Sequence, residues 1–221
     1  MQLQQVVANV VVVAHHFNPT ITDQIWLDKN KIIPADEAEG PFLYSDTAVH
    51  ALTRQFQMMI VPDKCQITLA PTAENAQELL VDRVGRLVST LPHTPYIAFG
   101  MNFIWHYVPP LGEASRISRE LFFVPSGRLH RSFDTEDARF GGYLSKNSLG
   151  CRLKVDVKPV LAESADNPEV DMILCTFNYH RDLAKEENPV GTILELLGRW
   201  NEASQEVKQI AEATFEEIEN A

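Results

Sequence analysis

The 221-residue chain contains 45% hydrophobic residues and carries a formal net charge of -11 at pH 7. This hydrophobic content is enough for a substantial core, which excludes disorder throughout the chain. The negative charge disfavours general attraction to nucleic-acid phosphates, because that attraction needs clustered lysine and arginine side chains. We therefore expect no nucleic-acid partner.

The cysteine pattern and the absence of a spanning segment predict a cytoplasmic location. Cys65, Cys151 and Cys175 lie within apolar strand patterns and show no C-x-x-C spacing. Three cysteines leave one unpaired whichever two are bridged, so we predict buried free thiols in a reducing compartment. The apolar run 6–14 is too short to cross a bilayer, and neither a basic segment nor a small-residue cleavage site accompanies it. We expect no association with membranes.

The first apolar segment covers residues 2–17 and includes four consecutive valines at positions 10–13. An apolar run without alternation predicts a strand covered on both faces, in the centre of a sheet. Residues 22–27 fit either a strand or a helical turn. The acidic stretch 36–41 predicts a solvated loop, and residues 42–52 predict an edge strand.

The middle of the chain gives the clearest pattern of elements. Two short apolar runs, 56–61 and 66–70, are separated by a proline-containing turn and predict a hairpin. Apolar residues then recur at helical spacing over 76–91. Residues 96–107 alternate between large apolar and smaller or polar side chains, which predicts a long strand with one face in the core.

The second half repeats this sequence of patterns less clearly. Residues 114–124 predict a short helix, and 126–147 mix glycine, charge and aromatics as a long excursion or mobile flap would. Residues 149–157 alternate strictly and predict a half-buried strand, to which residues 170–180 pair back in a second hairpin. A stripe of apolar residues over 190–218 predicts one long helix.

These elements predict an α+β protein with a single domain over 1–221. The expected architecture is a twisted, mainly antiparallel sheet with two long helices packed on one face. Each half, 1–92 and 93–221, has a long strand, a hairpin and a closing helix, so we hypothesise a duplicated strand-hairpin-helix unit. The alternatives are two small domains divided near 91–95, and a curved sheet wrapped around the final helix to enclose a ligand cavity.

The candidate site consists of asparagine and histidine residues at the ends of three predicted strands. In each pair the spacing is two or four residues, so both side chains project from the same face. If the strands were neighbours, imidazoles that titrate near neutrality and amides that orient a substrate would converge. The competing interpretation is that these side chains decorate a solvent-exposed sheet face. The six residues are His16, Asn18, Asn102, His106, Asn178 and His180.

Motifs for metal, nucleotide or nucleophilic chemistry are absent from the sequence. It has no H-E-x-x-H, G-x-S-x-G, P-loop or dinucleotide-binding pattern. His15 and His16 are adjacent, so in a strand their side chains would point to opposite faces. We expect no metal site and no cofactor.

A second candidate is a positively charged patch made by Arg116, Arg119, Arg128 and Arg131. It would bind an anionic ligand, the acidic surface of a partner or, as a local exception to the overall negative charge, nucleic acid. The alternative is a solvated segment whose charge is balanced by the acidic residues beside it. Nearby phenylalanines and the long final helix are candidates for contact with a second copy, so we expect a homodimer.

The leading functional hypothesis is a cytoplasmic binding or interaction protein that acts as a homo-oligomer with an unidentified small ligand or protein partner. It follows from the missing catalytic motifs and the long carboxy-terminal helix. The alternative is a hydrolase or isomerase that uses the histidine and asparagine cluster at the strand ends as acid, base and orienting groups.

Overall fold

A computed structural model of the protein describes residues 2–110, 112–164 and 167–219. The strands are β1 (Gln2–Ala14), β2 (Ala38–Tyr44), β3 (Val49–Thr53), β4 (Phe56–Val61), β5 (Lys64–Leu69), β6 (Tyr96–Val108), β7 (Gly142–Ser148), β8 (Cys151–Ser164) and β9 (Asn167–Asp182). The helices are the 3-10 helix η1 (Pro19–Ile21), then α1 (Gln24–Lys29), α2 (Ala76–Thr90), α3 (Ala114–Phe122), α4 (Arg128–Ser132), α5 (Pro189–Leu197) and α6 (Trp200–Glu219).

The fold is α+β, as predicted. Within the described residues, nine antiparallel strands form one sheet in the order β2-β3-β4-β5-β1-β6-β9-β8-β7. The hairpins β4-β5 and β8-β9 and the long strand β6 lie where alternation placed them. Among the described residues, no helix combines the length and apolarity needed to span a bilayer.

Strand β1 lies at the centre of the sheet, but only one of its faces is fully covered. Val10 and Val12 are 1% exposed, whereas Val11 and Val13 on the opposite face are half-buried. The strand ends at Ala14 rather than at residue 17. The uniform valine run misled the prediction because β-branched side chains suit both faces of a strand.

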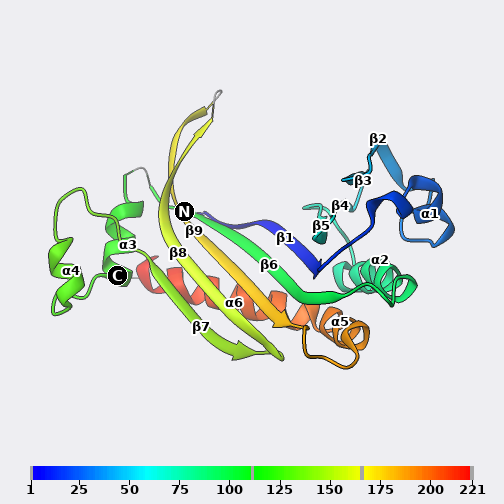
Figure 1. Ribbon diagram of the computed structural model, residues 1–221. Helices are drawn as coiled ribbons and strands as arrows, with labels where there is room; N and C mark the ends of the chain where they lie inside the picture. The colour runs from blue at the N-terminus through cyan, green and yellow to red at the C-terminus, as the bar shows by residue number, and fades with distance from the viewer. Residues whose placement is uncertain (1, 111, 165–166, 220–221) are drawn as a thin grey trace.

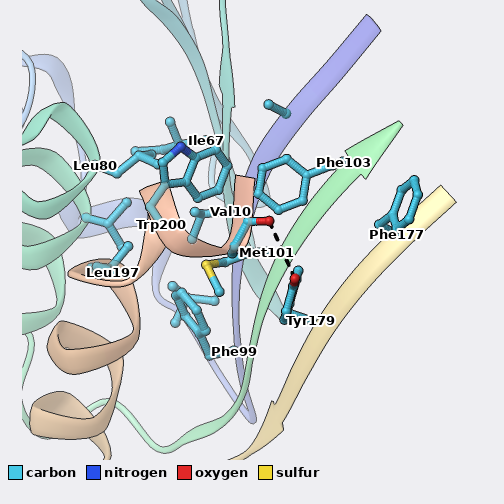
Figure 2. Close-up of a cluster of buried hydrophobic side chains, with 14 of the residues drawn as sticks. Val10, Ile67, Leu80, Phe99, Met101, Phe103, Phe177, Tyr179, Leu197 and Trp200 are labelled. Atoms are coloured by element: carbon cyan, nitrogen blue, oxygen red, sulfur yellow. Dashed lines mark hydrogen bonds between the residues drawn. The ribbon is translucent and has the colours of Figure 1, made fainter. Parts of the chain in front are cut away.

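The helices α2, α5 and α6 contact the sheet on the face that carries its buried side chains. Helix α2 contacts β5, α5 contacts β6, and α6 contacts β6 and β9; in Figure 1, α6 passes behind β8 and β9. Figure 2 shows Trp200 among core side chains from the sheet and α2, and its ring centroid lies 4.7 Å from that of Phe103. This residue therefore fixes the start of α6 on the sheet.

Two segments differ from the sequence prediction, and the structure decides between the two interpretations of a third. The predicted helix over 190–218 is two helices, because α5 closes at Gly198, whose N–H bonds to carbonyls of the last turn. The predicted loop 36–41 and edge strand 42–52 instead contain two strands. Strand β2 begins at Ala38, and a turn in which the Ser45 hydroxyl accepts the Ala48 N–H at 3.0 Å joins it to β3. The ambiguous residues 22–27 fall largely in α1.

The strand order is similar on the two sides of the neighbouring strands β1 and β6. Strands β5, β4, β3 and β2 follow outward from β1, and β9, β8 and β7 follow outward from β6, so the side of β1 has one more strand. Both halves thus return to a long central strand from a meander, which is the arrangement that a duplicated unit would produce. Duplication stays a prediction, and superposition of the two halves is its test.

Candidate functional site

Three asparagine side chains form a hydrogen-bonded ladder on the open face of the sheet. Register places Asn9, Asn102 and Asn178 side by side on β1, β6 and β9. The Asn178 amide donates to Asn102 Oδ1 at 2.5 Å, and the Asn102 amide donates to Asn9 Oδ1 at 2.8 Å. Two predicted site residues, Asn102 and Asn178, are therefore hydrogen-bonded to each other. Asn9 extends the ladder beyond Asn102, and in the sequence it is a lone polar residue inside an apolar run.

The predicted histidines do not join this ladder into a single cluster. His180 lies opposite Gly100, so His106 is six residues further along β6, roughly 20 Å away at the rise of a strand. Burial lowers the pKa of His106 from its ordinary value, which keeps the ring neutral at pH 7. The two imidazoles therefore cannot act on one small substrate.

His16 and Asn18 lie outside the strand that was predicted to carry them. Because β1 ends at Ala14, both residues are exposed in the connection that follows. Asn18 caps the 3-10 helix η1, where its side-chain oxygen accepts the Thr20 N–H at 3.2 Å. The polar pattern at this position is explained by helix capping.

The arginines of the predicted patch differ in their surroundings. Arg116 pairs with Glu113 and Glu120, and Arg119 pairs with Asp134. Arg119 also lies 4.5 Å above the ring centroid of Phe123. Both guanidinium groups are thus paired with acidic side chains, and that of Arg119 also lies on an aromatic ring. Arg128 and Arg131 are exposed on α4.

The cysteines lie in the core and are unpaired. Burial raises the pKa of Cys65 and of Cys175 to about 12, and that of Cys151 to about 11. Such thiols are protonated and unreactive at neutral pH. Among the described residues, no group of three or more histidine, cysteine or carboxylate side chains is arranged to hold a metal ion.

An apolar pocket of about 380 Å³ opens beside the edge strand β7, and we call it the β7 pocket. Strand β8 forms its floor, and α3, β7 and α6 form its walls; Figure 1 shows these four elements. It is lined by Leu121, Phe122, Leu144, Ser145, Lys146, Leu153, Val155, Val157, Ile210 and Thr214.

The strand alternation and one glycine create this pocket. Leu153, Val155 and Val157 project from β8 toward the helices because they occupy alternate positions. Gly142 leaves room for the ring of Phe122, which a Cβ at that position would overlap. Strand β7 is the last in the sheet, so Leu144 has no strand beyond it and stays 57% exposed.

One end of the β7 pocket carries a polar network centred on Glu206 of α6. Lys146 lies 2.5 Å from Glu206 Oε1, and Glu206 Oε2 accepts bonds from the Ser148 hydroxyl at 2.6 Å and the Tyr179 hydroxyl at 2.8 Å. Burial acts to raise the pKa of Glu206, but these hydrogen bonds outweigh it and hold the pKa below its ordinary value. Burial, and then the bond to Glu206, raise the pKa of Tyr179. The network is thus a carboxylate with three donors.

The chemistry of the lining residues suits binding rather than catalysis. Lys146 is the charged member, and the Thr214 hydroxyl is engaged with the Ile210 carbonyl at 2.7 Å. Local sequence patterns contain no signal for this pocket, because residues from four elements contribute to it.

The chain matches no known protein-family model and no curated protein sequence.

Proposed function

We propose that the protein is a binding protein that holds a small, largely apolar molecule in the β7 pocket. The observation that carries this proposal is the lining itself, in which seven of the ten residues are apolar. Its volume of about 380 Å³ lies near the lower end of the range of small-molecule pockets, roughly 300–1,000 Å³. A ligand of modest size is therefore expected.

Burial of apolar surface would supply most of the affinity. The floor residues Leu153 and Val155 are already buried and rigidly held in the sheet, so a ligand would find a preformed surface. Leu144, which is 57% exposed, would be covered by the bound molecule. Each buried methylene should contribute about 0.8 kcal/mol, or about a fourfold gain in affinity.

Calorimetric titration with hexanol, heptanol and 1-octanol tests this proposal. We expect binding that tightens about fourfold with each methylene until the chain fills the pocket. Ile210→Trp should fill the pocket and weaken 1-octanol binding at least tenfold. The control is Leu52→Trp on β3, where the native side chain is 43% exposed and distant in sheet order from β7. Failure of the unaltered protein to bind any of these alcohols would contradict the proposal.

We also propose that the protein acts as a homodimer in the cytoplasm. Support for the dimer comes from Val124, Leu129 and Phe133, large apolar side chains near α4 that are 51%, 69% and 59% exposed. The unpaired, buried cysteines support a reducing compartment. Light scattering should give twice the chain mass of 24.9 kDa, and Leu129→Asp combined with Phe133→Asp should halve it. A strict monomer before substitution would rule the dimer out.

The alternative of a hydrolase or isomerase has less support. General acid and base groups must reach the same substrate within hydrogen-bond distance. His106 and His180 are roughly 20 Å apart along the sheet, and His16 lies beyond the end of β1. We therefore propose binding and not catalysis as the function.

A further inference from the structure

The charge distribution around the β7 pocket is asymmetric. Lys146 is the charged residue among those that line it, and its side chain is 58% exposed. The other polar lining residues, Ser145 and Thr214, carry hydroxyl groups. A molecule lying in the pocket would thus be surrounded by apolar side chains and would meet, at one end, the Lys146 ammonium that pairs with Glu206.

The Lys146 ammonium has donors to spare. An ammonium carries three N–H groups, and the bond to Glu206 Oε1 at 2.5 Å uses one of them. The other oxygen of Glu206 accepts hydrogen bonds from the Ser148 and Tyr179 hydroxyls. Glu206 therefore keeps these two donors when Lys146 also binds a ligand. The network therefore holds Lys146 in place and leaves it able to pair with a second anion.

We propose that the β7 pocket takes an amphiphile with one anionic group, such as a medium-chain carboxylate, whose anion pairs with Lys146. This inference rests on the proposed function, since the apolar body of the same ligand occupies the pocket. Burial of the body provides affinity, and the ion pair fixes which end of the molecule lies at Lys146. A partly exposed ion pair of this kind should favour the anion about fivefold over a neutral head group.

The test compares three probes of equal chain length: octanoate, 1-octanol and octylammonium. At neutral pH and low salt, octanoate should bind about fivefold tighter than 1-octanol, with octylammonium the weakest. The preference for octanoate should diminish as salt is added, because exposed charges are screened.

Variants then assign the preference to Lys146. Lys146→Gln should abolish the advantage of octanoate over 1-octanol, while Lys146→Arg should retain it. Lys154→Gln is the matched control, because Lys154 lies on β8 but on the opposite face of the sheet. Retention of the octanoate advantage by Lys146→Arg shows that the charge at this position, and not only a folded pocket, sets the preference.

The outcomes separate this inference from the proposed function. If 1-octanol binds and octanoate binds no tighter, or octylammonium binds best, the anionic head group is wrong while the apolar binding site stands. If Lys146→Gln leaves the octanoate preference intact, the assignment to Lys146 is wrong. If none of the three probes binds, both proposals fail.

Discussion

The Tyr179 hydroxyl donates a 2.8 Å hydrogen bond to Oε2 of Glu206 and so joins β9 to α6 beneath the β7 pocket. Tyr179 is fully buried, and its hydroxyl also lies 3.4 Å from the Ala203 carbonyl. The pairing places an ionised carboxylate at the boundary between the core and the pocket. The contribution of this hydrogen bond to the free energy of unfolding can be measured by mutation.

Tyr179→Phe should lower the free energy of unfolding by about 2 kcal/mol, because it removes a hydrogen bond to a charged group and leaves Glu206 with fewer donors. Urea unfolding at pH 7 measures this loss. The control is Tyr143→Phe on β7, where the ring is 67% exposed and the change should stay within about 0.5 kcal/mol. Equal effects at both positions would show that the Glu206 bond adds no stability.

The stability supplied by Glu206 should depend on pH in a defined direction. Its folded pKa lies below its ordinary value of 4.5, so its contribution is complete above that value and is lost as pH falls through the folded pKa. The difference in unfolding free energy between the unaltered protein and Glu206→Gln should therefore be largest above about pH 5 and shrink below about pH 4. A difference in unfolding free energy that grew on acidification would contradict this prediction.

Gly142→Ala should damage the β7 pocket. The added methyl group would overlap the Phe122 ring, which must then move toward the pocket that it lines. We expect a loss of about 1–3 kcal/mol in unfolding free energy and weaker 1-octanol binding. Gly100→Ala is the matched control, because its new methyl group would meet its nearest neighbours at ordinary contact distances of 3.5 and 3.6 Å. Normal 1-octanol binding by Gly142→Ala would contradict the assigned role of Phe122.

The asparagine ladder should be most sensitive at its middle member. Asn102→Ala removes both ladder bonds and leaves Asn9 and Asn178 each without its partner, whereas Asn178→Ala removes one bond. We expect Asn102→Ala to cost about 1–3 kcal/mol and Asn178→Ala roughly half as much, measured by urea unfolding. A larger loss for Asn178→Ala would indicate that its other contacts dominate.

The fold was predictable where a single periodicity ran through a whole element. Strand β6 matches its predicted range closely because its large apolar residues occupy every second position from Phe99 to Tyr107. The break between α5 and α6 was missed because the apolar stripe continues through it, although Gly198 marks the position. The backbone at Gly198 ends α5, and the pattern of apolar side chains does not show this boundary.

The candidate site could be predicted only in part. The even spacing within each strand predicted that Asn102 shares a face with His106 and Asn178 with His180, since parity along a strand is local information. The pairing of Asn102 with Asn178 required knowledge that β9 lies beside β6 in this register, which no single strand encodes. Lys146 and Glu206 are 60 positions apart and meet only after α6 packs on the sheet, so sequence spacing gave no sign of them.

Methyl NMR of the protein labelled at isoleucine, leucine and valine is the most direct test that the β7 pocket is a binding site. Addition of octanoate should shift the methyl signals of Leu153, Val155 and Ile210. The signals of Val10 on β1 and Ile67 on β5, which lie in the core away from the pocket lining, should stay in place. Unmoved pocket methyl signals at saturating octanoate, or shifts confined to the open face of the sheet, would contradict the proposed function.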